Sequence, residues 1–497
     1  MIELTDIFMN MMRLDVILAV TFGTLLGVII GALPGLNGPI GVSLLLPITF
    51  SFSPEVGLLM LGGIYMGSHY GSSITAILLN APGDVVAACT AIEGYPMAKE
   101  GRAKEALYYS IIACVVGGTI GVLTLIFFTP PLAQLALQFG NSEVFLLGFF
   151  GLLIAATMSS GENITKGLFG VIFGLLLSTV GNDLLSGTSR LDFGLHELNA
   201  GINLIPVVIG LFAISSMLES LSIKSGQITS ISNITSSLTN VAKKVFIKPW
   251  LLLKSSSLGT FIGILPGAGG AIATFVAYAE AKRSSKTPEK FGKGNPEGIV
   301  SAESANNAAV GGSLVPLLAL GIPGSATAAI MYGALTIHGI VPGPDLFVTR
   351  PDVAYTFIVG MLLTVIVMGI FGVLGVPLFT YILRIKLNFI IPTVLVFCII
   401  GSYAIRNSLF DVLIAIVFGL LGFYFKKVDI PVALIVLGII LGPLIETNLR
   451  RTLITVEATD VNFFTFIFSR PISMTLIIIV ALLLFSIIWT KRNKIVD

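Results

Sequence analysis

Charged residues are scarce in this chain. It contains 28 lysines and arginines and 26 aspartates and glutamates among 497 residues, so only 11% of it is charged, whereas soluble proteins carry roughly 25%. Such a chain is not expected to form a large water-soluble domain. Hydrophobic residues make up 55% of the sequence and gather in many long runs, and the mean hydropathy is +0.99. The composition predicts an integral membrane protein with many helical spans facing membrane lipid.

Histidine and cysteine are also scarce, and the motifs of several catalytic classes are missing. His69, His196 and His338 show neither HExxH nor HxH spacing, so we assign no metal site. The three cysteines lie apart in apolar surroundings, as small buried hydrophobic residues do. FGKG at 291–294 lacks the upstream glycine of a P-loop, so no ATP-driven motor is expected within the chain. The basic clusters are short and flank apolar runs, so no nucleic-acid partner is expected.

A motif rich in glycine and proline, by contrast, occurs twice. Residues 27–38 read GVIIGALPGLNG and residues 259–270 read GTFIGILPGAGG. Pro34 corresponds to Pro266, a shift of 266 − 34 = 232 residues. Because proline removes a backbone donor and glycine opens a turn, each copy should interrupt an apolar helix.

A second break follows each copy of this motif. GSS at 71–73 leads to APG at 81–83, and GS at 312–313 leads to IPG at 322–324, a shift of 323 − 82 = 241 residues. Interrupted helices leave free N–H and C=O groups, which persist at membrane depth only where they bind a ligand, line a water-filled cavity or are buried in protein. Broken helices in matching positions of two halves are typical of transporters built from repeats.

The distribution of basic residues predicts how the segments cross the membrane. Residues 250–281 have basic flanks on both sides and are too short to cross twice, since each crossing takes about 20 residues. We therefore expect a re-entrant helical hairpin with Pro266 at its tip. Residues 16–52 have few basic flanks and would form the matching hairpin from the opposite face, although 16–33 and 39–52 are also compatible with two short spans.

The predicted fold is an all-α polytopic membrane protein with two inverted-topology repeats. Each repeat would contain a re-entrant hairpin and a broken transmembrane helix, which move as a transport domain against a scaffold in an elevator-like arrangement. We expect about eleven crossings besides the two hairpins, with the C-terminal KRNK in the cytoplasm. The expected segments are a first repeat at 1–221 with hairpin 16–52 and broken helix 56–95, a cytoplasmic linker at 222–249, and a second repeat at 250–497 with hairpin 250–281 and broken helix 301–340.

The hairpin tips are the predicted binding site for an anionic solute. A helix N-terminus carries about +0.5 of an elementary charge and presents open N–H donors to a carboxylate. Glycines let a solute approach the backbone, and amide side chains add polar contacts. The alternative is that glycine and proline only allow kinks and close helix packing. The predicted substrate-binding residues are Pro34, Gly35, Asn37, Gly38, Pro266, Gly267, Gly269, Gly270, Asn306 and Asn307.

The second pair of breaks is the predicted site of a coupling ion, and no other cofactor is expected. Hydroxyls and freed carbonyls are oxygen ligands that suit Na⁺, and H⁺ is the other candidate ion. Any single serine or threonine here could instead bond to its own helix. The predicted cation-binding residues are Ser72, Ser73, Asn80, Gly83, Asp84, Ser313, Gly324, Ser325 and Thr327.

Two further polar residues lie in apolar surroundings. Glu303 shares a helix face with Asn307 and would either line the translocation pathway or cap a helix at the interface. His69 would either relay protons or lie buried as a satisfied imidazole. Because Ser72 and Ser73 lie close to His69, an intramembrane hydrolase is a second possible class. The sequence shows neither an acidic partner nor a nucleophile turn for it, so we do not expect an enzyme.

Long stretches of the sequence carry a family resemblance. They are GALPGLNGPIGVSLLLPITF at 31–50, the segment from YGSSITAILLNAPGD onward at 70–107, GTFIGILPGAGGAIATFVAYAEAKR at 259–283, and the segment containing SAESANNAAVGGS at 291–344. In these stretches the chain resembles the large membrane subunit of the tripartite tricarboxylate transporters, the TctA family. The resemblance implies a bacterial inner-membrane permease that works with a periplasmic solute-binding protein and a small membrane subunit. It also implies cation-driven uptake of citrate or another carboxylate.

The chain departs from the family pattern at two positions. Asn37 stands where the family usually has glycine, and Asp84 stands where it usually has threonine. An additional acidic group near the site would alter the coupling ion or the substrate charge that is tolerated. The alternative within the same class is a carboxylate or anion carrier that works alone, without a binding protein.

Overall fold

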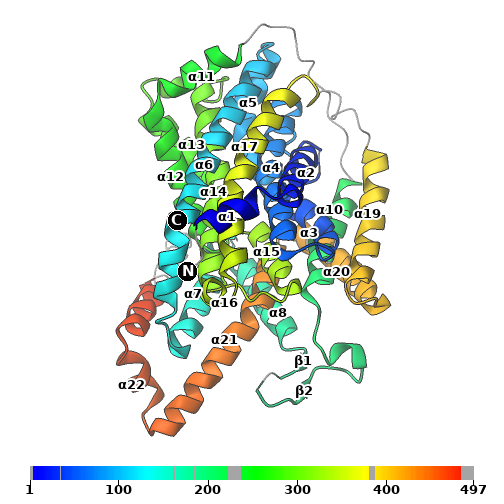
Figure 1. The fold of residues 1–497 in the computed structure, drawn as a ribbon, viewed down its shortest axis with the longest axis vertical. Helices are drawn as coiled ribbons and strands as arrows, with labels where there is room; N and C mark the ends of the chain where they lie inside the picture. The colour runs from blue at the N-terminus through cyan, green and yellow to red at the C-terminus, as the bar shows by residue number, and fades with distance from the viewer. Residues whose placement is uncertain are drawn as a thin grey trace, which may run out of the picture. The chain divides into compact units, whose positions relative to one another are not determined.

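The chain is almost entirely helical (Figure 1). A computed structural model describes residues 4–33, 35–159, 163–183, 185–221, 237–379 and 387–482. Within these ranges the only strands are β1 (Gly181–Asn182) and β2 (Ser189–Arg190), which pair antiparallel. The first part of the predicted linker, 222–236, and the C-terminal KRNK lie outside the described residues.

The helices follow the predicted apolar runs. The predicted hairpin at 16–52 contains α2 and α3, and the one at 250–281 contains α12 and α13. The described helices are α1 (Leu4–Met11), α2 (Leu14–Gly31), α3 (Gly38–Thr49), α4 (Pro54–Leu79), η1 (Val85–Ala87), α5 (Ala88–Lys99), α6 (Ala103–Ala136), α7 (Asn141–Ser159), α8 (Ile164–Ser178), η2 (His196–Leu198), α9 (Leu204–Val208), η3 (Ile209–Ile214), α10 (Ser215–Ser220), α11 (Leu238–Phe246), α12 (Pro249–Ile264), α13 (Gly269–Ser284), η4 (Pro288–Lys290), α14 (Pro296–Leu320), α15 (Ala326–Ile337), α16 (Leu346–Thr349), α17 (Pro351–Gly375), α19 (Leu387–Ala404), α20 (Leu409–Lys427), α21 (Val432–Thr459) and α22 (Phe463–Phe468).

Several helices meet the requirements for crossing a membrane. Within the described residues, 6 are long and apolar enough, namely α2, α6, α7, α17, α20 and α21. Shorter apolar helices, including α3, α8 and α15, accompany them. The chain is therefore an all-α polytopic membrane protein, while the exact number of crossings stays a prediction.

The chain divides into two compact units. One combines Met1–Ala133 with Ile205–Tyr424, and the other combines Gln134–Leu204 with Phe425–Asp497. Each unit takes segments from both predicted repeats, whose bounds stay a prediction. All predicted site residues belong to the first unit.

Glycines hold the first hairpin and the second hairpin against long partner helices. A Cβ atom on Gly27 of α2 would lie 2.5 Å from the carbonyl oxygen of Ile64 in α4, and one on Gly259 of α12 would lie 2.3 Å from that of Ala305 in α14. Only glycine permits helix backbones to approach this closely. We call these two contacts the glycine seams, α2 on α4 and α12 on α14.

The two seams use equivalent positions. Ile64 and Ala305 are 305 − 64 = 241 residues apart, and Gly27 and Gly259 are 259 − 27 = 232 apart. The same shifts relate Gly71, whose Cβ would lie 2.4 Å from the Val28 oxygen, to Gly312, whose Cβ would lie 2.3 Å from the Thr260 oxygen. The sequence repeat thus recurs as a repeat of packing contacts.

Both long partner helices end at the predicted second breaks. α4 stops before Asn80 (φ 53°) and α14 before Gly321 (φ 72°), and both residues adopt the left-handed conformation that closes a helix. Pro82 and Pro323 follow two residues later and prevent either helix from continuing.

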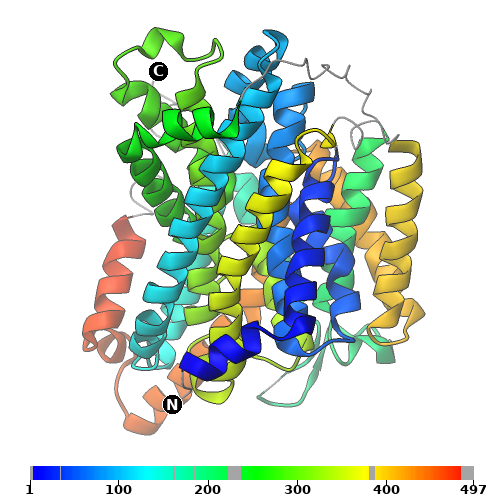
Figure 2. The ribbon, with the colours of Figure 1, turned by 45° about the horizontal axis from the view of Figure 1, so that its top comes forward.

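Other helices surround this pair of seams. α17 lies beside both α2 and α6 in Figures 1 and 2, and a Cβ on its Gly372 would lie 2.3 Å from the Ile111 side chain of α6. The segment 204–220 contains a π-helical stretch, η3, which is followed by α10. Ser220 of α10 contacts the first hairpin tip, because its Oγ lies 2.5 Å from where a Cβ on Gly35 would lie.

A buried carboxylate connects α5 to the segment before α14. Glu93 is fully buried. Its Oε1 accepts hydrogen bonds from Tyr278 Oη (2.7 Å) and the Gly292 amide (2.5 Å), and its Oε2 from the amides of Gly294 (2.8 Å) and Asn295 (2.7 Å). Gly294 has φ +83°, which lets successive amides converge on one anion. We call this arrangement the Glu93 latch.

The second unit is built on α7, α8 and α21. A Cβ on Gly174 of α8 would lie 2.2 Å from the Ile435 oxygen of α21. Asp183, in the loop that carries β1 and β2, accepts bonds from the Leu185 amide (2.8 Å) and from Arg450 Nη1 (2.5 Å). The loop amides, and then Arg450, hold the pKa of Asp183 at about 2, below its usual value.

Candidate functional site

The first hairpin tip lies between α2 and α3. Gly35 has φ +82°, and the Asn37 side chain accepts a hydrogen bond from the Ile40 amide at 3.1 Å, so it caps the N-terminus of α3. Pro34 lies outside the described residues. A glycine at position 37 could not supply this side-chain cap.

The second hairpin tip lies between α12 and α13. Gly267 has φ +75° and its amide donates to the Gly324 oxygen at 3.1 Å, so this tip contacts the break between α14 and α15. Pro266 precedes it in the turn, and α13 begins at Gly269.

His69 of α4 lies between the N-termini of the two hairpin helices. A Cβ on Gly38, the first residue of α3, would lie 3.8 Å from His69 Cδ2. A Cβ on Gly270 of α13 would lie 3.2 Å from His69 Cε1 and 3.4 Å from Asn306 Oδ1. Because Cδ2 and Cε1 flank Nε2, this ring nitrogen faces the space between the two helix N-termini.

Asn306 of α14 fixes the orientation of this ring. Its Nδ2 donates to the His69 carbonyl at 3.2 Å, so its Oδ1 faces His69 Nδ1 at 2.7 Å. An amide oxygen only accepts, so Nδ1 carries the proton and Nε2 is left for a ligand. His69 is 4% exposed and Asn306 is fully buried.

A third helix N-terminus opens beside this pair. Ser325 Oγ accepts from the Ala328 amide at 3.1 Å and caps α15. Ser325 also bonds to Tyr65 Oη at 2.7 Å, and Tyr65 bonds to Ser313 Oγ at 2.9 Å. Thr327 Oγ1 lies 3.4 Å from where a Cβ on Gly38 would lie. The N-termini of α3, α13 and α15 therefore converge on the His69–Asn306 pair.

The other predicted amide, Asn307, lies one residue along α14 and is fully buried. Its Nδ2 donates to the Met66 carbonyl at 3.3 Å. Its Oδ1 has no hydrogen-bond partner in the described part of the chain. A buried acceptor without a donor suits a bound cation or a donor group of a ligand.

Glu303 of α14 is a further polar residue beside Asn306. It is fully buried and accepts from Thr90 Oγ1, from Cys114 Sγ at 3.1 Å and from Asn306 Nδ2 at 3.4 Å. The cap of α14 is Asn295, whose side chain accepts from the Glu297 amide. Glu303 is therefore not an interfacial helix cap.

The first break brings together fewer of its predicted cation ligands. Ser72 donates to the His69 carbonyl (2.9 Å) and Ser73 to the Tyr70 carbonyl (2.7 Å), so both bond to their own helix. The Ser73 hydroxyl also contacts Ser110 of α6 at 2.7 Å. Neither serine hydrogen bonds to the His69 ring in the described residues, so the geometry of a hydrolase nucleophile is not present.

The remaining residues of the first break have local structural contacts. The Gly83 amide donates to Thr75 Oγ1 at 3.1 Å, and a Cβ on Gly83 would lie 2.7 Å from the Gly31 oxygen. Asp84 Oδ1 accepts from the Val86 amide at 3.4 Å and caps η1. Asn80 supplies the left-handed C-cap of α4. Within the described residues, no group of His, Cys, Asp and Glu could hold a metal ion.

Sequence reasoning missed Tyr65, Thr90 and Cys114. A signal for Tyr65 was present, because it lies 306 − 65 = 241 residues before Asn306 and thus occupies the equivalent position of the repeat. Thr90 and Cys114 belong to α5 and α6, and no sequence pattern indicates that they face α14.

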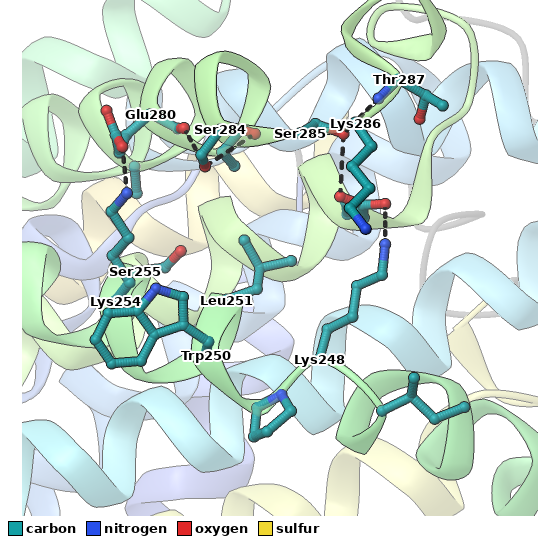
Figure 3. Close-up of a pocket in the computed structure, with 15 residues that line it drawn as sticks. Lys248, Trp250, Leu251, Lys254, Ser255, Glu280, Ser284, Ser285, Lys286 and Thr287 are labelled. Atoms are coloured by element: carbon teal, nitrogen blue, oxygen red, sulfur yellow. Dashed lines mark hydrogen bonds and ion pairs between the residues drawn. The ribbon is translucent and has the colours of Figure 1, made fainter.

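A separate cavity lies at the other end of the second hairpin. It has a volume of about 490 Å³ and is lined by the start of α12 and the end of α13, including Trp250, Lys254 and Glu280 (Figure 3). Lys254 pairs with Glu280 and Lys248 with Glu297. None of the predicted site residues lines this cavity, and two of its lysines, Lys248 and Lys254, are already paired with glutamates, so we do not assign it to the solute.

Comparison with known proteins gives one family. The model of the tripartite tricarboxylate transporter TctA family matches residues 17–437. An uncharacterized 52.8 kDa protein in the TAR-I ttuC' 3'region of Agrobacterium vitis is 38% identical over 488 residues, covering 95% of this chain and 94% of that protein. An uncharacterized protein in the TAR-II ttuC' 3'region of the same organism is 36% identical over 241 residues, covering 48% of this chain and 98% of that protein. No solved structure matches. With a match over most of its length, the chain belongs to the TctA family of tripartite tricarboxylate transporters.

Proposed function

We propose that this chain is the permease subunit of a cation-coupled carboxylate uptake system, and that the solute binds where α3, α13 and α15 begin. The observation that carries the proposal is the convergence of these three helix N-termini on His69 and Asn306. Each helix N-terminus contributes a partial positive charge, which favours a carboxylate. The buried surroundings strengthen these interactions relative to water.

Family membership supports the expected partners. The family name describes a tripartite tricarboxylate transporter, so the permease would receive its solute from a periplasmic binding protein and work with a small membrane subunit. It would lie in a bacterial inner membrane with its C-terminus in the cytoplasm. Which carboxylate is carried does not follow from these residues.

The repeated packing contacts support two structural repeats, and we propose that these repeats are inverted and move in an elevator-like way. Gly27 with Ile64 and Gly259 with Ala305 build the same seam twice, so each hairpin and its long helix would move as one piece of a transport domain. If the coupling ion is Na⁺, it would bind at the second breaks. Ser313, Ser325 and the unpaired Asn307 Oδ1 supply oxygens near the solute site.

The test is uptake by the complete complex in liposomes, with the binding protein added. We expect labelled carboxylate to accumulate only with an imposed Na⁺ or H⁺ gradient. The Asn306→Ala variant should raise the half-saturating solute concentration about 10- to 100-fold, because one or two hydrogen bonds to the site are lost. Asn182→Ala, at the exposed residue of β1, is the matched control. Accumulation without any gradient would refute the coupling, and an unaffected Asn306→Ala variant would refute the site.

Uptake at the full rate without the binding protein would instead indicate a carrier that works alone. The same assay, with the binding protein omitted, therefore separates the two forms of the proposal.

A further inference from the structure

Glu303 is a carboxyl group buried among neutral partners. Its oxygens accept from the Thr90 hydroxyl on α5, the Cys114 thiol on α6 and the Asn306 amide on α14 itself. In the described part of the chain no lysine, arginine or histidine forms an ion pair with it. Its counterpart in the first repeat is position 303 − 241 = 62, a glycine. The carboxyl group is therefore unique to one repeat.

The titratable groups around Glu303 do not supply a positive charge either. Cys89 of α5, Cys114 of α6 and Tyr70 of α4 are close enough to interact with its charge. His69 of α4 bonds to Asn306, which in turn bonds to Glu303. Glu93 of α5 points its carboxylate into the latch formed with Tyr278 and the backbone amides.

A carboxylate in such a place costs several kcal/mol of desolvation that no cation offsets, so a bound proton stabilises it. Sodium fits the immediate surroundings poorly. Na⁺ needs oxygen lone pairs, as hard cations do, whereas Cys114 and Asn306 turn S–H and N–H hydrogens toward the carboxyl group. These surroundings suit a proton better than Na⁺.

Asn306 connects this carboxyl group to the proposed solute site. Its Nδ2 lies 3.4 Å from Glu303 Oε2 and its Oδ1 lies 2.7 Å from His69 Nδ1. An ionised Glu303 would repel a carboxylate held at the helix N-termini, and a protonated one would not. Proton and anionic solute would therefore each favour binding of the other, which is the thermodynamic condition for symport.

We propose that Glu303 carries the coupling proton, by binding H⁺ on its carboxylate from one side of the membrane together with the solute and releasing it on the other. The inference rests on the proposed function, because it assumes that a carboxylate binds beside His69 and Asn306. One H⁺ is gained and lost at an oxygen of Glu303 in each cycle, and no other bond changes.

The test uses the reconstituted complex in sodium-free buffer with an imposed inward proton gradient and labelled carboxylate. In the wild type, we expect the gradient to raise uptake about tenfold and an entrapped pH dye to report H⁺ entry with the solute. In Glu303→Gln, uptake with and without the gradient should become equal, whereas Glu303→Asp should restore part of the stimulation. Glu289→Gln, at an exposed position in η4, is the carboxylate control.

Thr90→Val provides a second variant in which Glu303 stays in place. Loss of one hydrogen bond to the ionised form should shift the pH of half-maximal uptake upward by about one unit, a tenfold change in proton affinity. This readout applies even if Glu303→Gln does not fold. A purely structural role for Glu303 would leave the midpoint unmoved.

The outcomes separate this inference from the function. If the wild type neither takes up nor exchanges any carboxylate, the proposed function is wrong. If it responds to a sodium gradient alone, or if Glu303→Gln keeps the full response to the proton gradient, the function stands and the role of Glu303 is wrong.

Discussion

Removing one charge from the Glu93 latch should loosen the segment before α14. Glu93→Gln keeps the shape of the side chain and replaces one acceptor oxygen by an NH₂ group. On the Oε2 side this group would face the amides of Gly294 and Asn295, both of them donors. It should therefore turn toward Tyr278, whose hydroxyl can rotate to accept, and leave the Gly292 amide without a partner.

The size of the effect follows from these bonds. Hydrogen bonds to a charged group contribute about 1.5–3 kcal/mol each, and a buried donor left unpaired costs about 1–3 kcal/mol. One unpaired amide together with two bonds that lose their charge gives a total of about 3–5 kcal/mol. Tyr278→Phe removes only one bond and should cost about 1.5–2 kcal/mol.

Hydrogen exchange measured by mass spectrometry on a peptide covering 288–298 reports this loss directly. Since each 1.4 kcal/mol of local opening free energy is about tenfold in rate, the amides should exchange at least about 100-fold faster in Glu93→Gln. The increase should be about tenfold in Tyr278→Phe and absent in Glu289→Gln. Exchange in Glu93→Gln within threefold of the wild type would show that the latch does not hold this segment.

Other parts of the structure give further tests. Gly27→Ala and Gly259→Ala place a Cβ 2.5 Å and 2.3 Å from a carbonyl oxygen, so each should destabilise the detergent-solubilised protein by about 1–3 kcal/mol. Gly170→Ala of α8, where the atom nearest to the new Cβ would lie 3.3 Å away, is the helical control, and equal shifts in melting temperature would contradict the packing argument. Gly38→Ala would crowd Ser68 Oγ, 2.9 Å from the new Cβ, and should weaken carboxylate binding at least tenfold in an equilibrium binding assay; unchanged affinity would place the solute elsewhere. The pKa of Asp183 is lowered to about 2, from about 3.9 in an unfolded chain, so its stabilising effect should be complete above about pH 4 and disappear as the pH falls toward 2. In Asp183→Asn the melting temperature should not change with pH over this range, and a pH profile identical to that of the wild type would contradict the assignment.

The positions of the helices could be predicted from the sequence because backbone chemistry is local. The Pro-Gly pairs at 82–83 and 323–324 and the glycine-rich tips combine a missing donor with a turn, and α4 and α14 end at the predicted breaks. The shifts of 232 and 241 residues between the two copies could likewise be predicted from the sequence alone. They reappear in the seams because equivalent glycines face equivalent carbonyl oxygens.

The partners of the polar side chains could not be predicted in the same way. Ser72 and Ser73 donate to carbonyl oxygens of their own helix, which was the alternative to a cation site, because the nearest acceptor for a buried helical hydroxyl is the preceding turn. Thr90 and Cys114 reach Glu303 from two other helices, and only tertiary packing decides which helix faces align. His69 could have been either a relay or an inert core residue from sequence, and its bond to Asn306 distinguishes its two nitrogens.

The glycine seams limit how the protein could change shape. Where two backbones touch with no side chains between them, there are no rotamers to rearrange, and sliding by one residue would drive carbonyl oxygens into Cα atoms. Any rearrangement that alternately opens the site to either side of the bilayer must leave α2 on α4 and α12 on α14 joined. A cysteine cross-link placed within a seam should therefore be tolerated during turnover, whereas one placed between a seam and its neighbours would arrest it.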